Sequence, residues 1–333
     1  MSLEQRAEQL DEARRLRIIK SDSIDVEKYL HSNDITIKVK QARDFLDDIK
    51  ESYLSTARDT KIVLPWSKTH DSFAFRPGEV TVYAGSNGGG KSLLTGQIAL
   101  HLVKQNQKVC IASFEMKPIK TLERMLRQFS GEFIDDPLVS DREAYITKIL
   151  TRMDKFTVDH LYLYDQQGTT SPDKVIAMAR YCAVELGVQH IFIDSLMKCV
   201  KNEDDFNGQK GFIDELTALA RDHNVHIHLV HHIRKQASDE VTPNKNDLKG
   251  SGSISDQVDN VFLVWRNKKK ENQRNRGETV DESQGDTFLM NEKQRNGEAQ
   301  EWYQLWYHQA SQQFVESAGS RPQDFDNNGR FRD

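Results

Sequence analysis

The segment GSNGGGKS, residues 85–92, contains the residue types that can hold a chain of phosphates. It fits the pattern G-x-x-x-x-G-K-[ST], follows the apolar run EVTVYAG and opens the helix pattern KSLLTGQIALHLVK. Glycines let successive backbone N–H groups face phosphate oxygens, and the start of a helix adds a positive dipole. We therefore expect a nucleoside triphosphate to be cradled by Gly85, Ser86, Asn87, Gly88, Gly89 and Gly90, with Lys91 on the β- and γ-phosphates and the Ser92 hydroxyl on Mg²⁺.

Two carboxylates follow strand patterns at points where a parallel sheet would bring them to those phosphates. Asp194 ends HIFID (190–194), where a carboxylate can hold Mg²⁺ through water. Glu115 follows KVCIASF (108–114), where it can orient and deprotonate the water that attacks the γ-phosphate. The alternatives are a turn cap for Asp194 and an acidic first-turn residue for Glu115. The phosphate loop favours the site interpretation for Asp194, whereas spacing alone leaves Glu115 open.

His231 and His232 close the run VHIHLVHH (225–232), and no third ligand stands at metal-binding spacing. One of them can sense the γ-phosphate; a hydrogen-bonded histidine at a strand end is the alternative. The long polar loop 233–253 follows and ends in KGSGS. It has no aromatic residue for base stacking, but it suits the phosphates of a single strand. The DNA-binding candidates are Arg234, Lys235, Lys249, Gly250, Ser251 and Gly252.

Two further basic groups need an explanation. The stretch NEKQRNG (291–297) places Lys293 and Arg295 two residues apart, so on a strand both would face the same side. Taken alone, such a charge run is typical of a solvated turn. From Trp265 to Arg276 there are six basic residues against Glu271, and six minus one gives +5. We expect this segment to be a flexible solvated loop or to lie near a phosphate backbone.

The composition limits the class of protein. The chain has 333 residues with a hydrophobic fraction of 37%, and its net charge of −5 argues against a surface that coats nucleic acid all over. No run approaches the roughly 18 apolar residues of a membrane span, and the charged start MSLEQRAEQLDEARRL is not a signal segment. Cys110, Cys182 and Cys199 lack metal-ligand spacing, which indicates reduced, buried thiols in a cytoplasmic protein.

Alternating strand and helix patterns position these residues and predict an α/β fold. Short apolar strands separated by helices imply a mostly parallel sheet covered on both faces. These strands are expected at 79–85, 108–114, 161–165, 190–194 and 225–232. Later strands at 259–265, 286–293 and 301–308 have no long helices between them and predict an antiparallel C-terminal extension.

Three parts of the chain are expected to differ in organisation. Residues 61–315 form the ATPase domain, and residues 316–333 read as a disordered tail. Residues 1–60 are expected to be a short helical segment, in which an apolar stripe from Val39 to Tyr53 must pack on this chain's core or on another subunit.

Taken in order, these motifs resemble the RecA-like ATPase domain of DnaB-type replicative helicases, a P-loop NTPase. The likeness is strongest to the helicase half of phage and mitochondrial primase-helicases. It spans roughly residues 75–300. The matching stretches are AGSNGGGKS, SFEMKP with LERML, HIFIDSL, VHHIRK, DLKGSGSISDQVDNVFLVWR and EKQRNGE. The phosphate loop is common to many families, whereas SFEM, DLKGSGSISDQVDNV and KQRNG are more particular.

The resemblance implies an ATP- and Mg²⁺-dependent helicase that moves 5′ to 3′ along single-stranded DNA. It assigns Glu115 as catalytic base, Asp194 to Mg²⁺, His232 as γ-phosphate sensor and residues 247–253 to the DNA loop of a central channel. In this family a Lys and an Arg spaced as in KQR reach the neighbouring subunit's ATP. Lys293 and Arg295 would therefore act in trans, in a homo-hexameric ring.

The chain also departs from the family pattern. Its first 60 residues are too short for the helical N-terminal domain of bacterial replicative helicases, and it has no primase or zinc segment. The stripe Val39 to Tyr53 would fit the linker helix that packs on an adjacent subunit. We expect a separate primase or loader as partner, in a bacterial or phage-infected cell. A RecA- or RadA-like strand-pairing ATPase and an ATP-switched helicase loader or regulator remain as alternatives.

Overall fold

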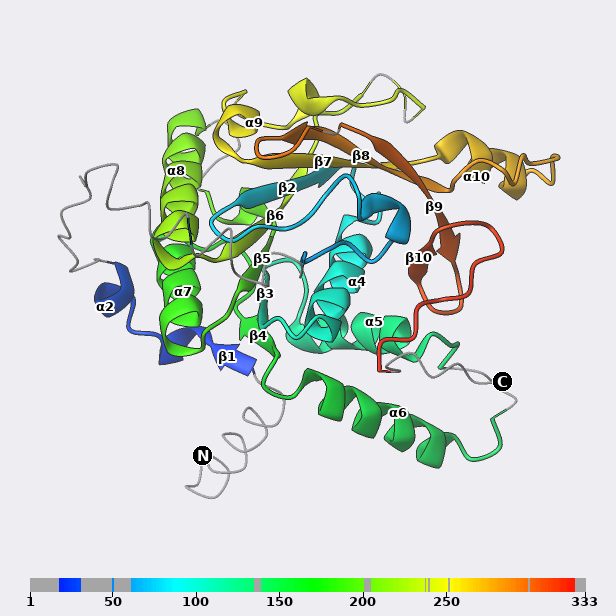
Figure 1. Cartoon of the computed structure of the whole chain (residues 1–333), viewed down its shortest axis with the longest axis horizontal. Coiled ribbons are helices and arrows are strands. Elements are labelled where there is room, and N and C mark those ends of the chain that lie inside the picture. Colours follow the sequence, from blue (N-terminus) through cyan, green and yellow to red (C-terminus); the bar gives the residue numbers. More distant parts are fainter. Residues whose placement is uncertain are drawn as a thin grey trace.

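A mixed β-sheet crosses the protein, and helices lie on both of its faces (Figure 1). The computed structural model describes residues 18–30, 50, 61–134, 139–200, 205–236, 238, 240–250, 252–298 and 300–326. Within this part of the chain the sheet has ten strands in the order β1-β4-β3-β5-β6-β2-β7-β8-β9-β10. Two apolar cores, one on each face, hold the layers together.

The central strands are parallel, as their continuous apolar runs predict. They are β2 (Val80–Gly85), β3 (Val109–Ser113), β4 (Leu161–Asp165), β5 (His190–Asp194), β6 (His226–His232) and β7 (Asn260–Arg266). The core on one face contains apolar residues of α7 (Pro172–Glu185) and α8 (Phe206–His223). The core on the other contains residues of α4 (Lys91–Lys104), α5 (Pro118–Ser130) and α6 (Arg142–Thr157).

The antiparallel extension is also confirmed. It consists of β8 (Thr287–Gln294), β9 (Trp302–His308) and β10 (Gln313–Val315), each antiparallel to its predecessor in the sheet. Short elements link the larger ones: 3₁₀ turns η4 (Ser67–Thr69), η5 (Leu196–Lys198) and η6 (Lys245–Asp247), and the single helical turn α9 (Ile254–Gln257). No helix in the described ranges is long and apolar enough to cross a membrane.

The N-terminal segment, expected to be helical, also contributes a strand in its described part. β1 (Ile18–Lys20) adds a parallel edge strand beside β4, and after the 3₁₀ turn η1 (Ser21–Ser23) the short α2 (Val26–Leu30) packs on α7. Ile19, Ile24 and Tyr29 join the core. A three-residue strand is too short to leave a periodic signal, which is why the pattern missed it. The stripe Val39 to Tyr53 lies outside the described residues.

The tail is packed as far as Asp326, contrary to the expectation of disorder from residue 316. The Phe325 side chain is 1% exposed in the core beside α6. The Arg152 guanidinium donates to the Asp326 carboxylate at 2.6 and 2.7 Å. The low hydrophobicity of this stretch concealed one anchoring aromatic residue. Residues 327–333 lie outside the described part of the chain.

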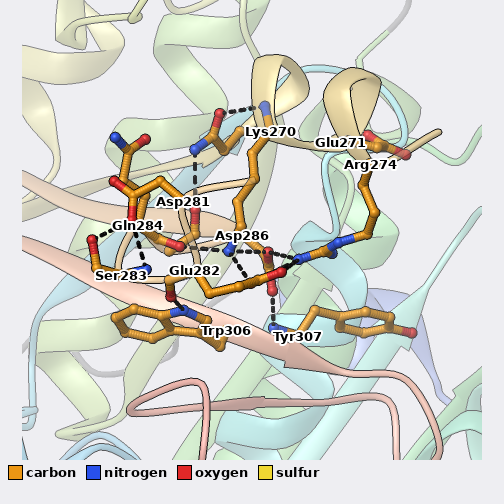
Figure 2. A network of polar contacts seen from close by, with 12 residues as sticks. Lys270, Glu271, Arg274, Asp281, Glu282, Ser283, Gln284, Asp286, Trp306 and Tyr307 are labelled. Atoms are coloured by element: carbon orange, nitrogen blue, oxygen red, sulfur yellow. Dashed lines mark hydrogen bonds and ion pairs between the residues drawn. The ribbon is translucent and has the colours of Figure 1, made fainter. Parts of the chain in front are cut away.

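The basic segment 265–276 is the end of β7 followed by a helix, not a flexible loop. α10 (Lys268–Asn275) begins at Asn267, whose side chain accepts a hydrogen bond from the Lys270 N–H. Figure 2 shows how acidic groups surround it: the Lys270 ammonium, 3% exposed, lies 3.0 Å from Glu282 and 2.9 Å from Asp286. Arg274 contacts the same two carboxylates. The carboxylates that neutralise much of this charge come later in the sequence, so a local charge count cannot include them.

Candidate nucleotide and nucleic-acid site

The carboxyl ends of β3, β5, β6 and β2 lie side by side, because these strands are adjacent and parallel. This edge therefore gathers Glu115, Asp194, His232 and the loop after Gly85, although they are far apart in sequence. Glu115, Asp194, His232 and residues 87–92 line one cavity of about 920 Å³. An open cleft at the carboxyl edge of a parallel sheet is the usual ligand position in such folds.

The backbone of the phosphate loop requires glycine at several positions. Gly88 and Gly90 have φ values of 70° and 89°, which side chains with a Cβ rarely adopt. A Cβ on Gly85 would collide with the Val264 carbonyl oxygen of β7. The loop can therefore curl tightly into the N-terminus of α4, which begins directly after Gly90. Its N–H groups and the helix dipole together suit a phosphate chain.

The Lys91 ammonium stands at the floor of the cavity. It donates to the carbonyl oxygens of Gly85 at 3.0 Å and Ser86 at 2.8 Å, and lies 3.3 Å from His232 Nδ1. Burial lowers the pKa of Lys91, while the nearby carboxylates of Asp194 and Glu115 act in the opposite direction. Polyphosphate oxygens could replace the loop carbonyls as partners of this buried cation.

Ser92 and Asp194 form a pair suited to a hard cation. The Ser92 hydroxyl donates to Asp194 Oδ2 at 2.7 Å. Burial raises the pKa of Asp194, and the Ser92 hydrogen bond opposes that shift. Mg²⁺ in nucleotide sites takes one or two protein oxygens and completes its shell with water and phosphate oxygens. The two side chains present fit that requirement.

Glu115 and His232 lie close together on one wall of the cavity. Ser195 Oγ donates to Glu115 Oε1 at 2.9 Å, and His232 Nε2 lies 3.7 Å from the same oxygen. Burial lowers the pKa of His232, and the Lys91 charge adds to this. His231 points elsewhere: it is fully buried, and its Nε2 lies 2.5 Å from the Lys249 carbonyl oxygen. His232 thus faces the nucleotide cavity, whereas His231 contacts the following loop.

The loop after His232 is tethered to the sheet at both ends, although the sequence predicted no structure for it. Ile233 bridges Leu248, and the Arg234 N–H donates to the Asp247 carbonyl at 2.7 Å. Gly250 has a φ of 91°, and a Cβ there would collide with the amide of Gln209 in α8. Lys235 and Gly252 are exposed, whereas Ser251 lies outside the described residues. Lys249 is thus held against His231 and His232, and Arg234 and Gly250 lie beside it.

One part of the site escaped the sequence analysis. A cavity of about 220 Å³ adjoins Gly88, Gly89 and Gly90, and Asp194 is not part of its lining. Tyr307 of β9, Phe314 of β10 and Arg266 of β7 line it, so an aromatic and cationic wall lies beside the phosphate loop. Such a wall suits a planar nucleobase. These residues come from the antiparallel extension, and no motif in the sequence connects them with the loop.

The structure does not bring Lys293 and Arg295 to this chain's own cavity. β8 runs antiparallel to β7, so Lys293 lies opposite Val261 at the amino end of β7, whereas Thr287 lies opposite Arg266 near the phosphate loop. Five residue steps separate these positions, roughly 17 Å along the strand at about 3.3 Å per residue. Both side chains instead donate to main-chain carbonyls at the end of α9.

A phosphate loop, strand-end carboxylates and this sheet order define a P-loop ATPase of the RecA-like class. The model of the family described as "DnaB-like helicase C terminal domain" matches residues 71–316. The chain belongs to this family, and it is an ATP-hydrolysing DNA helicase of the replicative type.

Two solved structures show the same fold. The ATPase domain of a phage helicase matches with a TM-score of 0.70 at 16% identity, over 84% of this chain and 99% of that one. "The Structure Of A DnaB-Like Replicative Helicase And Its Interactions With Primase" matches with a TM-score of 0.65 at 16% identity, over 84% of this chain and 67% of that one. The predicted fold class is confirmed.

Proposed function

We propose that this chain is the motor subunit of a homo-hexameric ring that hydrolyses ATP with Mg²⁺ and moves 5′ to 3′ along single-stranded DNA, excluding the other strand. The observation that carries the ring is the separation within one chain. Lys91, Ser92, Glu115, Asp194 and His232 converge on one cavity, while Lys293 and Arg295 lie at the opposite end of the sheet. The direction rests on the family resemblance.

Within one subunit the cavity residues have distinct roles. Residues 85–90 cradle the phosphates, the Lys91 ammonium binds the β- and γ-phosphate oxygens, and Ser92 and Asp194 hold Mg²⁺, which when bound neutralises phosphate charge. The Glu115 carboxylate takes a proton from the attacking water. A bond forms between that oxygen and the γ-phosphorus, and the bond to the β–γ bridging oxygen breaks to release ADP.

The neighbouring subunit supplies the remaining cations. Lys293 and Arg295 would stabilise charge on the transferring phosphoryl group in the next subunit's site, a contribution of about 10³–10⁵ in rate. The Arg295 side chain is 39% exposed, so it is accessible to a neighbour. An isolated subunit would bind nucleotide and hydrolyse it poorly.

The loop after β6 connects the nucleotide with the DNA. His232 would sense the γ-phosphate, and its neighbour His231 contacts the Lys249 carbonyl oxygen. Nucleotide state can therefore shift the loop that carries the DNA-binding candidates. These are Arg234, Lys235, Lys249, Gly250, Ser251 and Gly252, which we assign to phosphates of the strand.

The domain organisation and partners complete the proposal. We assign residues 61–315 to the ATPase domain. Residues 18–30 precede it but add β1 to its sheet and pack in its core, so we assign the contact with an adjacent subunit to the remaining part of residues 1–60. A separate primase or loader would complete the assembly in the cytoplasm of a bacterial or phage-infected cell. One solved structure of similar fold is described together with its interactions with primase, which supports that class of partner.

The decisive experiment measures ATP hydrolysis with and without single-stranded DNA, together with unwinding of a 5′-tailed fork. Lys91→Ala serves as the inactive control. DNA-stimulated hydrolysis with strand separation supports the motor. Hydrolysis without separation would contradict it and favour a strand-pairing ATPase or an ATP-switched loader, and imaging of rings or filaments would then distinguish those two.

A further inference from the structure

A second cavity, of about 590 Å³, lies beside the nucleotide cavity on the side of loop 233–250. Four residues line both cavities and so form the partition between them: Asn87, Glu115, Lys198 and His232. Beyond the partition the wall includes Arg234, Lys235 and Lys249 of the loop. The second cavity therefore lies between the part of the nucleotide site around Glu115, where water would attack, and the loop assigned to DNA.

The charge of this cavity is strongly positive. Its lining contains four basic side chains, Lys198, Arg234, Lys235 and Lys249, against the single carboxylate of Glu115, and four minus one gives +3. His232 adds no charge near neutral pH, because burial lowers its pKa. Clefts lined by one sign of charge raise the local concentration of ions of the opposite sign. The occupant should be a small anion.

Lys198 is a half-buried lysine of this lining that belongs to neither the phosphate loop nor loop 233–250. It ends η5, which follows Asp194 and Ser195, and its main chain is fixed by hydrogen bonds to Ser195 at 3.0 Å and from Thr170 at 2.9 Å. The side chain is half-buried, yet its ammonium makes no hydrogen bond or ion pair with any residue that the structure describes. Partial burial of a charge without a partner is unfavourable, and an anion would supply the missing partner.

We propose that the second cavity is a phosphate site centred on Lys198, which takes either the inorganic phosphate formed by hydrolysis or a backbone phosphate of the bound strand. This inference deepens the proposed function and rests on it. Water attacks from the Glu115 side, giving ADP and hydrogen phosphate, with the proton passing through Glu115 to solvent. The new phosphate forms against the partition that Lys198 shares with Glu115 and His232.

The test measures binding of inorganic phosphate to the full chain loaded with ADP, by isothermal titration calorimetry. Lys198→Ala should weaken phosphate binding about tenfold or more, whereas Lys198→Arg should retain most of it. Lys155→Ala, on the exposed side of α6, is the matched control and should bind as the wild type does. ADP affinity should be the same in all four proteins. A parallel series measures single-stranded DNA affinity against salt concentration.

Each result has a defined meaning. Weaker phosphate binding with an unchanged salt slope supports a site that binds the inorganic phosphate formed by hydrolysis. A salt slope reduced by about 0.7, with unchanged phosphate binding, supports the site with the DNA backbone as its source. If neither changes, or if ADP affinity falls in parallel, the proposal is overturned.

Calorimetry requires no turnover, so the two proposals can fail separately. If the wild-type chain binds phosphate through Lys198 but unwinds no fork, the phosphate site is supported and the proposed motor function is contradicted. If the wild-type chain unwinds forks but Lys198→Ala changes neither phosphate binding nor the salt slope of DNA affinity, the motor function is supported and the phosphate site is contradicted.

Discussion

The two ends of the parallel strands carry similar polar side chains but use them differently. At the carboxyl end, Lys91, Lys198 and His232 line cavities that a ligand can enter. At the amino end, polar groups bond one another: the Asp259 carboxylate accepts from the Val80 N–H at 2.9 Å and pairs with Arg295 at 3.0 Å. One end is organised to bind and the other to be rigid.

This difference explains how one chain can provide half of two active sites. Lys293 donates three hydrogen bonds, to the carbonyl oxygens of Ser255, Asp256 and Val258. Such contacts fix the position of a long, flexible side chain before any neighbour arrives, and because they use all three of its N–H donors, phosphate oxygens would have to replace carbonyl oxygens when it binds. A rigid amino end is therefore a suitable place from which to present cations to another subunit.

The strongest test of the carboxyl end is Lys91→Ala. We expect loss of nucleotide binding and of hydrolysis, because no other described ammonium donates to the loop carbonyls where the phosphates would lie. The fold should persist, since the substitution removes a charge that is costly to bury. Fluorescent-nucleotide titration and circular dichroism check both points, with Lys155→Ala as control. A folded variant that still binds ATP normally would show that the cavity is not the nucleotide site.

Arg295→Ala tests the amino end. Nucleotide binding should stay within about threefold of wild type while hydrolysis falls by about 10³ or more, because the residue acts only on a neighbour's transition state. The fold should tolerate the change, since Asp259 keeps the Val80 N–H and Arg221 as partners. Arg276→Ala, which changes an exposed arginine just after α10, is the control.

Mixing experiments then decide whether Arg295 acts in trans. Mixed assemblies of Arg295→Ala and Glu115→Ala subunits contain some interfaces with an intact Glu115 on one side and an intact Arg295 on the other. We expect partial recovery of hydrolysis in the mixture, measured against each variant alone. A mixture as inactive as its components would contradict action across the interface.

The rigidity of the amino end should depend on pH. His190, His226 and His228 are buried there. His190 Nδ1 lies 3.0 Å from His228 Nε2, and His226 Nε2 lies 2.8 Å from the Thr81 hydroxyl. Burial lowers all three pKa values, that of His226 to about 4. The unfolded chain binds protons from about pH 6.5 downward, whereas the folded chain does not, so stability is complete above pH 6.5 and falls toward pH 4.

Urea unfolding between pH 7 and pH 4 measures this effect. Each buried histidine should contribute about 1.4 kcal/mol for every unit by which its folded pKa lies below the unfolded value. His226→Gln should reduce the fall in the free energy of unfolding between pH 7 and pH 4. His160→Gln, at a partly exposed position, should leave that fall unchanged. If His226→Gln does not alter the pH dependence of the free energy of unfolding, His226 does not contribute to the loss of stability in acid.

The sequence predicts the carboxyl end of the sheet better than the amino end. The phosphate loop, Glu115, Asp194 and His232 each adjoin a strong apolar strand, so their meeting follows from the rule that parallel strands end on the same edge. The register of β8 on β7 decides where Lys293 lies, and that register depends on a bulge between Val261 and Phe262. A single-residue irregularity of this kind leaves no signal in the hydrophobic pattern.

Contacts distant in sequence account for most of what the sequence did not predict. The Arg266–Tyr307–Phe314 wall, the neutralised helix α10 and the packed Phe325 each require an element whose partner lies elsewhere in the chain. Lys198 went unnoticed because an isolated lysine after a strand resembles any surface residue. Its place on the partition between two cavities emerges only when η5 is placed against Glu115 and His232.

The smallest expected effect concerns the loop that joins the two cavities to DNA. Lys249→Ala should lower the slope of log affinity against log salt for single-stranded DNA by about 0.7, the value for one phosphate contact, and leave nucleotide affinity unchanged. The carbonyl of residue 249 still accepts from His231 after the substitution, so the loop should keep its place. Lys155→Ala provides the control. An unchanged slope would exclude Lys249 from the DNA interface, whereas a slope lowered together with nucleotide affinity would mean that the loop itself had moved.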